Sequence, residues 1–250
     1  MPEPRRITGG ITPPVRDPFP PTNLPSDRPR RPRFLPQPRI LVPAAAAVVF
    51  LGLALLIVSG RSFSLDTTLI MLFREAGNPA VPLGPAWLHE AVRDMTALGS
   101  FVGLFFMALT ATLALWLCGY RHLAIGLVVS LAAAFLASTG LKIAIARERP
   151  DIVGHAALTF TASFPSGHAF LSAVTLLTIA GFVGLASRRA DIARFCMVMA
   201  VIMVGLIGLS RIYLGVHWPS DVLGGWALGV VWSSVVIAWL GRRMAASDPA

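Results

Sequence analysis

The chain has 250 residues, of which 55% are hydrophobic and only 13% charged, and its formal net charge is +9. Soluble domains average about 25% charged residues, so this composition excludes an ordinary cytosolic domain. The arginines do not indicate a nucleic-acid-binding protein either, because they form no continuous face or stripe: eight precede Ile40 and most others lie between apolar segments.

The segment 1–39 is predicted to be a disordered cytoplasmic tail. It holds 12 of the 20 prolines and eight arginines, with too few aliphatic side chains to bury a core. Its basic stretch 28–33 directly precedes the first apolar run. There it serves as a topology signal or contacts anionic lipid headgroups.

Six apolar runs follow the tail, and each is long enough to cross a bilayer as a helix. The runs are about 41–60, 101–120, 123–141, 169–186, 195–214 and 220–240. In the connection between the first two, the segment 86–94 is predicted to be a short interfacial helix, because Trp is enriched at membrane interfaces. We therefore predict an all-α, integral-membrane six-helix bundle over 40–243, with a C-terminal tail at 244–250.

The basic residues between the runs predict the orientation. With the N-terminus inside, 14 basic residues lie on the cytoplasmic side and seven on the other. Cytoplasmic segments carry the excess of Lys and Arg, so both termini are expected in the cytoplasm. The expected location is a bacterial inner membrane.

Three polar clusters interrupt the second half of the chain, and the span count puts all of them on the extracytoplasmic side. They are the segments 142–150, 164–168 and 210–221. Ionisable residues at span ends are costly and point to function. Lys142, Arg149 and Arg211 suit a multivalent anion such as phosphate, since Arg binds its oxygens bidentately and Lys acts as a compact charge. If the third helix continued past its run, Lys142 and Arg149 would share a face.

Two of these clusters have the pattern of helix starts. Ser166 is a natural N-cap, Gly167 allows close backbone approach, and the free N–H groups of the first turn would face an anion. Pro219 suits the first position of the last helix, which places His217 before it and Asp221 in its first turn. Asp221 could then accept a hydrogen bond from one ring nitrogen of His217, leaving the other nitrogen to attack phosphorus.

These residues resemble the three-part signature of the type 2 phosphatidic acid phosphatase (PAP2) superfamily. The matching positions are Lys142 with Arg149-Pro150, then Pro165-Ser166-Gly167-His168, then Ser210-Arg211 with His217 and Asp221. The resemblance covers about 60–240. It implies an all-helical membrane fold and a cofactor-free, metal-independent hydrolysis of a phosphomonoester or pyrophosphate through a phosphohistidine.

The resemblance also implies the role of each residue. His217 would be the nucleophile, Asp221 would orient it, and His168 would be the general acid that protonates the leaving oxygen. The groups implied to hold the phosphoryl oxygens are Lys142, Arg149, Arg211, Ser166 and the amide of Gly167.

The first functional hypothesis is a lipid phosphate phosphatase that binds the bilayer and acts on phosphatidate, phosphatidylglycerol phosphate or undecaprenyl pyrophosphate. The second is a phosphotransferase that passes phosphate from undecaprenyl pyrophosphate to another lipid. A transporter or scaffold would need a polar path through the bundle, whereas the charges here cluster at one face. Cys118 and Cys196 lie inside apolar runs and indicate no cysteine-based metal site.

Overall fold

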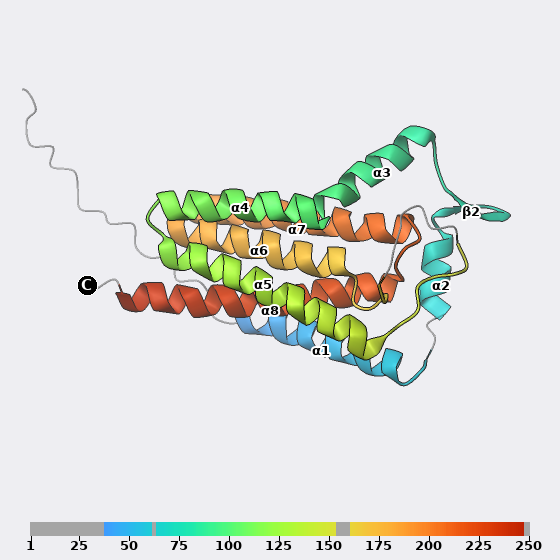
Figure 1. Cartoon of the computed structure of the whole chain (residues 1–250), viewed down its shortest axis with the longest axis horizontal. Helices are drawn as coiled ribbons and strands as arrows, with labels where there is room; N and C mark the ends of the chain where they lie inside the picture. Colours follow the sequence, from blue (N-terminus) through green and yellow to red (C-terminus); the bar gives the residue numbers. More distant parts are fainter. Residues whose placement is uncertain (1–37, 62–63, 154–160, 248–250) are drawn as a thin grey trace, which may run out of the picture. The chain divides into compact units, whose positions relative to one another are not determined.

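The computed structural model of the protein describes residues 38–61, 64–153 and 161–247. Most of the tail expected at 1–39 lies outside these residues. The described part forms helices and one short β-hairpin (Figure 1). In chain order these are α1 (Pro38–Val58), α2 (Ser64–Met71), β1 (Arg74–Glu75), β2 (Asn78–Pro82), α3 (Ala86–Leu98), α4 (Phe101–Leu117), α5 (Arg121–Ile145), α6 (Gly167–Ser187), α7 (Ala190–Tyr213) and α8 (Pro219–Ser247).

The predicted all-α membrane fold is confirmed, with two local differences. The antiparallel β1–β2 hairpin pairs Arg74 with Pro82 and Glu75 with Asn78. It was not expected, because prolines are poor strand formers. The last helix, α8, runs to Ser247 and so extends into the segment assigned to a C-terminal tail.

Each of the six predicted apolar runs falls in a helix. Among the described residues, α1, α5, α6, α7 and α8 are each long and apolar enough to cross a membrane. The 17-residue α4 meets that test only together with α3, from which it is bent by 50°. The bend occurs where α3 ends at Gly99 and the Ser100 hydroxyl accepts a hydrogen bond from the Gly103 amide at 3.1 Å, which starts α4. The helix expected at 86–94 therefore exists, but it continues to Leu98 and adjoins a span.

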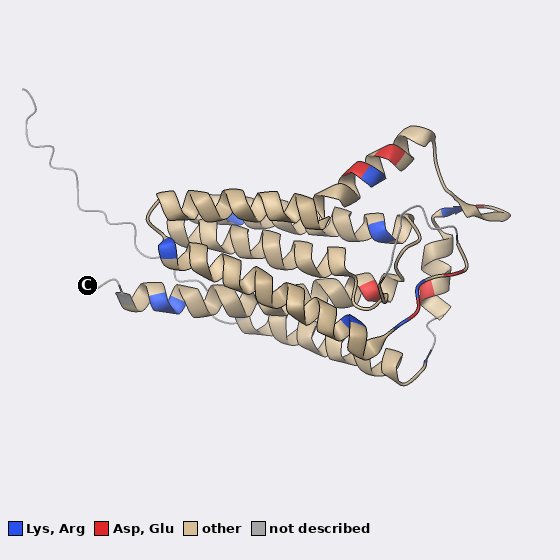
Figure 2. Ribbon diagram, viewed as in Figure 1, with Lys and Arg blue, Asp and Glu red and all other residues tan. Residues whose placement is uncertain are grey.

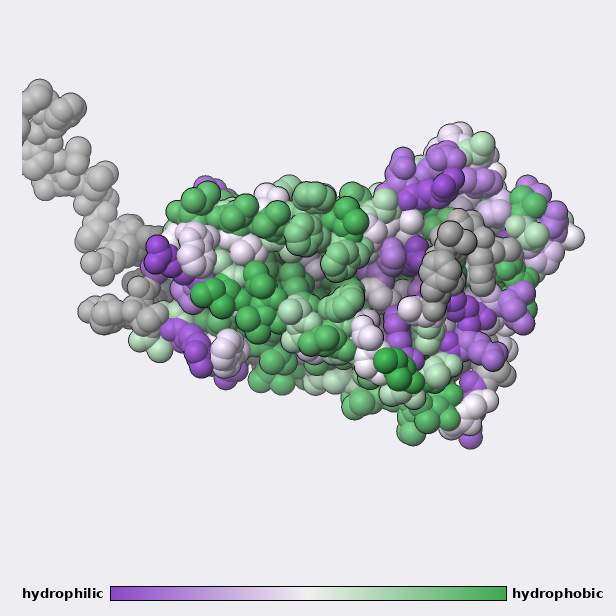
Figure 3. Space-filling view, viewed as in Figure 1, coloured by the Kyte–Doolittle hydropathy of each residue, from purple (hydrophilic) through white to green (hydrophobic). Residues whose placement is uncertain are grey.

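The long helices run side by side, and α6 packs against α4, α5, α7 and α8. Charged residues gather at the two ends of these helices (Figure 2), and apolar side chains cover the visible flank between the ends (Figure 3). Two glycines bring α8 close to α6: a Cβ on Gly229 would lie 2.4 Å from the Ala173 Cβ, and one on Gly225 would lie 2.9 Å from the Ser166 carbonyl oxygen. This contact is the small-residue packing that lets helix backbones approach closely in membranes.

Helix α5 does not continue far enough for Lys142 and Arg149 to share a helical face. Ala146 adopts a left-handed conformation (φ 48°) and its amide donates to the Lys142 carbonyl, which ends the helix. Lys142 thus lies in the last turn of α5, whereas Arg149 lies in the non-helical segment beyond it. The residue before a proline disfavours the helical conformation, and Arg149 precedes Pro150. The two cations therefore do not share a helical face.

Candidate active site

All three predicted clusters meet at one end of the bundle. Lys142 comes from the last turn of α5, Arg211 from the last turn of α7, and Asp221 from the first turn of α8. The amide of Ser166, just before α6, donates to the Asp221 carbonyl at 3.0 Å and so joins the starts of α6 and α8. Segments distant in sequence are therefore connected directly at this end.

His217 lies in the α7–α8 connection and is only 2% exposed. Arg149 Nη1 lies 3.2 Å from His217 Nε2. A guanidinium can only donate, so Nε2 is the acceptor and carries no proton. Nδ1 therefore carries it, 3.4 Å from Asp221 Oδ2 and 3.3 Å from Ser163 Oγ. Burial lowers the pKa of His217 to about 4, although Asp221 opposes the shift, so the ring is neutral near pH 7 and Nε2 keeps its lone pair.

Asp221 is fully buried, and hydrogen bonds fix the position of its carboxylate. Its carboxylate accepts hydrogen bonds from the Ser163 hydroxyl at 2.5 Å, the Trp218 amide at 2.9 Å and Arg147 Nη1 at 2.5 Å. Because the Ser163 proton goes to Asp221, the Ser163 oxygen is available to accept from His217 Nδ1. The carboxylate thus orients the imidazole both directly and through Ser163.

The three predicted phosphate-binding cations come from different segments. Arg149 is fixed by the backbone, since its Nε donates to the Thr161 carbonyl at 2.8 Å and its Nη1 to the Val216 carbonyl at 2.6 Å. Lys142 Nζ donates to the Ala162 carbonyl at 2.6 Å. Arg211 Nη1 donates to Thr96 Oγ1 at 2.9 Å, which links the site to α3. Each guanidinium or ammonium keeps further donors for an anion.

The start of α6 supplies the remaining predicted groups. Ser166 occupies the N-cap position as expected, but the prediction that its hydroxyl caps the helix is wrong. Its Oγ is buried and has no hydrogen-bond partner among the described residues, and the same is true of Arg211 Nε. A Cβ on Gly167 would lie 3.7 Å from Lys142 Cε, so this glycine lies beside the lysine side chain. His168, one residue on, interacts electrostatically with Arg211 and His217.

The arrangement is suited to phosphoryl transfer onto histidine. A neutral, oriented nitrogen lies beside fixed positive charge, and two buried polar groups, Ser166 Oγ and Arg211 Nε, are available to bind oxygen atoms. Preorganised donors of this kind stabilise the charge that develops on a transferring phosphoryl group. This end of the molecule is thus a candidate phosphate site.

The structure adds a buried ion-pair network that the sequence analysis missed. Arg147 donates to Asp221 Oδ1 through Nη1 and to Asp66 Oδ2, at 2.8 Å, through Nη2. Asp66, on α2, also accepts from the Ser220 amide at 2.8 Å and the Ser220 hydroxyl at 2.5 Å. Ser163 lies only three residues before Ser166 in the sequence, and this proximity to a predicted site residue could have suggested that Ser163 also belongs to the site. Asp66 carries no such signal, since it is a single carboxylate in a long connection.

Asp66→Asn is expected to lower the thermal stability of the protein markedly. The substitution takes one of two carboxylates from Arg147, whose side chain is only 14% exposed, and breaking a buried ion pair from one side costs up to about 3 kcal/mol. Thermal unfolding of the purified protein measures the effect. Asp191→Asn is the matched control, because Asp191 pairs with Arg189 on the exposed surface, where such pairs contribute little. Equal losses in the two variants would show that the Asp66 network is not an integral part of the fold.

Comparison with known proteins gives consistent similarities. The model of the PAP2 superfamily matches residues 123–245. A phosphatidylglycerophosphatase B from Bacillus subtilis is 34% identical over 157 residues, which are 61% of this chain and 75% of that protein. An undecaprenyl-diphosphatase from Sulfolobus acidocaldarius is 39% identical over 70 residues, which are 27% of this chain and 28% of that protein.

A solved structure is similar over most of its length. The crystal structure of a transmembrane PAP2-type phosphatidylglycerolphosphate phosphatase from Bacillus subtilis aligns with a TM-score of 0.68 and 25% sequence identity. The alignment covers 84% of this chain and 98% of that one. The similarity therefore extends beyond the motif residues to the arrangement of the helices.

Proposed function

Because the chain belongs to the PAP2 superfamily, we propose that it hydrolyses the terminal phosphate or diphosphate of a membrane lipid through a phosphohistidine on His217. The observation that carries this proposal is the neutral Nε2 of the buried His217, 3.2 Å from Arg149 Nη1, at one end of an apolar bundle. A lipid phosphate meets that position with its headgroup at the membrane surface while its chains stay in the bilayer.

In the proposed first step, Nε2 of His217 attacks phosphorus and the bond to the leaving oxygen breaks. His168 donates a proton to that oxygen, so that the lipid leaves as an alcohol or a shorter phosphate. Lys142, Arg149 and Arg211 stabilise the negative charge on the phosphoryl oxygens. The imidazolium character of the phosphorylated ring is stabilised by Asp221, which already accepts from its Nδ1 side.

In the proposed second step, water attacks the phosphohistidine and His168, now neutral, takes a proton from that water. The bond between Nε2 and phosphorus breaks, and inorganic phosphate leaves. The proton that His168 gives up leaves with the lipid product in the first step, and the attacking water replaces it in the second, so His168 and His217 both return to their starting states. Since three side-chain cations supply the positive charge, we expect the activity to persist in the presence of EDTA.

The substrate class in this proposal is a lipid that ends in a phosphate or a diphosphate, with or without a small polar group between that phosphate and the lipid. A cavity of about 330 Å³ adjoins Arg149, and its lining carries both cationic and acidic side chains, among them Arg147 and Asp66. The relatives are named for phosphatidylglycerophosphate and for undecaprenyl diphosphate.

Phosphate release by the purified protein from phosphatidate, phosphatidylglycerol phosphate and undecaprenyl diphosphate tests the proposal. Release from at least one of them in EDTA is the expected result. Release that requires a second lipid as phosphate acceptor would instead identify a phosphotransferase. No release from any of the three would overturn the assignment.

We propose further that the site faces the extracytoplasmic side of a bacterial inner membrane, with both termini in the cytoplasm, as the distribution of basic residues indicates. Single cysteines at the exposed positions Ala190 and Asp151, in a background without Cys118 and Cys196, test it. On intact cells, an impermeant thiol reagent should label position 151 and not position 190. The reverse pattern would invert the proposed topology.

Modification of amines is expected to inactivate the protein, because Lys142 is its only lysine. An amine-specific reagent can reach only this side chain and the N-terminus, and vanadate, which occupies a phosphate site, should protect against it. Lys142→Arg should retain less than about a tenth of the wild-type rate, since a wide, planar guanidinium does not replace a compact ammonium that lies close to Gly167.

The Lys142→Arg protein also supplies the control, since its only remaining amine is the N-terminus. Its residual activity should not fall further on modification. Full activity of this variant, or of the modified wild-type protein, would remove Lys142 from the phosphate site.

A further inference from the structure

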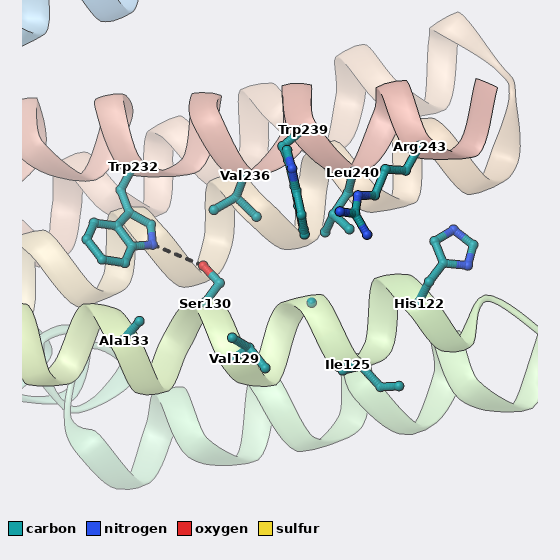
Figure 4. A pocket seen from close by; sticks show the side chains of 11 residues that line it. His122, Ile125, Val129, Ser130, Ala133, Trp232, Val236, Trp239, Leu240 and Arg243 are labelled. Atoms are coloured by element: carbon teal, nitrogen blue, oxygen red, sulfur yellow. Dashed lines mark hydrogen bonds between the residues drawn. The ribbon is translucent and has the colours of Figure 1, made fainter. Parts of the chain in front are cut away.

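A lipid-sized groove lies between α5 and α8, at the opposite end of these helices from His217. Its volume is about 720 Å³, and its walls run from His122 to Ala133 on α5 and from Trp232 to Arg243 on α8 (Figure 4). Lys142 lies twenty residues further along α5 than His122. At 1.5 Å per residue this separation is about 30 Å, close to the hydrocarbon thickness of a bilayer. The groove and the phosphate site therefore lie at opposite membrane surfaces.

The outer end of the groove is polar and positively charged. Arg243 and His122 both project into the gap between the two helices there (Figure 4). The guanidinium of Arg243 lies over the Trp239 ring, 4.1 Å from its centroid. Arg and Trp side chains with this placement are typical of the headgroup level of a membrane.

The rest of the groove is apolar. Ile125, Val129 and Ala133 line it from α5, and Val236 lines it from α8. The polar groups at its deep end bond to each other, since Trp232 Nε1 donates to Ser130 Oγ at 3.0 Å. The apolar floor thus offers a path for a hydrocarbon chain, and the Trp232 indole N–H at its deep end is already bonded.

We propose that this groove binds an anionic phospholipid of the leaflet opposite the catalytic site. The phosphodiester of the lipid lies between Arg243 and His122, and one acyl chain lies along the apolar floor. Charge complementarity selects this occupant, because basic clefts between transmembrane helices are the kind of site that recognises anionic headgroups. The bound lipid is a diester and lacks the terminal phosphate of the proposed substrate, so it is a structural ligand of the bundle.

Two neighbouring arginines allow a matched test. Arg243 lines the groove, whereas Arg242 does not and donates its Nε proton to the Ala238 carbonyl of its own helix. Arg243→Gln and Arg242→Gln remove the same charge from the same membrane surface. A difference between them therefore reports the groove itself and not the general field of basic residues.

Native mass spectrometry of the full chain titrated with phosphatidylglycerol, and separately with phosphatidylcholine, measures the binding. The wild-type protein should retain phosphatidylglycerol in preference to phosphatidylcholine. Arg243→Gln should weaken phosphatidylglycerol binding about fivefold, the factor that corresponds to loss of one basic contact at a membrane surface. Arg242→Gln should bind as the wild type does, and all variants should keep the wild-type phosphate-release rate, which shows that they are folded.

A second variant tests the apolar floor. Ala133→Trp fills the groove without changing charge, and it should abolish retention of phosphatidylglycerol. Three results would overturn the proposal: equal retention of the two lipids by the wild type, equal weakening by the two arginine variants, or conversion by Ala133→Trp of a dimer into a monomer. The last result would identify a second copy of the chain as the occupant. None of these results depends on which lipid the catalytic site cleaves.

Discussion

His217→Ala is expected to abolish lipid phosphate release, by roughly 10⁴-fold or more, because it removes the only atom proposed to attack phosphorus. The same variant should form no acid-labile phosphoenzyme when the purified protein is mixed with radiolabelled substrate and quenched. Neutral His217 is already oriented by Asp221 and Ser163. The loss should therefore come from the missing nitrogen and not from rearrangement of its neighbours.

His89→Ala is the control for this result. His89 lies on α3 with its ring 5.9 Å from that of Tyr213, outside the phosphate site. The His89→Ala variant should retain nearly the full rate of phosphate release and the full phosphoenzyme signal. An acid-labile phosphoenzyme that persists in His217→Ala would show that another residue is the nucleophile and would overturn the proposed mechanism.

His168→Ala is expected to slow the reaction by roughly 10²- to 10⁴-fold, the range for loss of a general acid, when the leaving group is a lipid alcohol. An alkoxide is a poor leaving group and depends on the proton that His168 is proposed to supply. An aryl phosphate, whose phenolate leaves readily, should show a much smaller loss. Steady-state rates with the two substrates, compared in the wild type and the variant, measure the difference.

An equal loss with both substrates would contradict the role of general acid. It would indicate that His168 instead shapes the site, for example through its contact with the break between α3 and α4, where a Cβ on Gly99 would lie 3.3 Å from His168 Cδ2.

The helices could be predicted, and the central residues of the candidate site could be proposed, because each depends on local sequence. Apolar runs of span length specify helices in lipid, and Pro219 with Asp221 specifies the start of α8. The same reasoning failed at Ser166, whose position is that of an N-cap but whose hydroxyl bonds to no helix amide. A cap and a ligand-binding hydroxyl have the same sequence pattern, so only the geometry distinguishes them.

The supporting residues could not be predicted because their contacts are non-local. Asp66 reaches Ser220 and Arg147 across sequence separations of 154 and 81 residues. No spacing or periodicity connects such positions in a single sequence. The break between α3 and α4 lies where the predicted apolar run begins, at 101, but the extension of α3 to Leu98, next to that run, was not predicted.

The close glycine contact between α6 and α8 should make the geometry of the proposed active site independent of the thickness of the bilayer. His168 belongs to the first turn of α6 and Asp221 to the first turn of α8, and Gly225 and Gly229 hold these two helices at backbone contact. Bilayers that differ in thickness by a few Å act on proteins chiefly by tilting helices that face lipid. We expect the exposed flank of α1 to respond in this way and the close-packed α6–α8 pair to move as a unit. The proposed proton donor and the carboxylate that orients the proposed nucleophile should then keep a constant separation in membranes of different lipid composition.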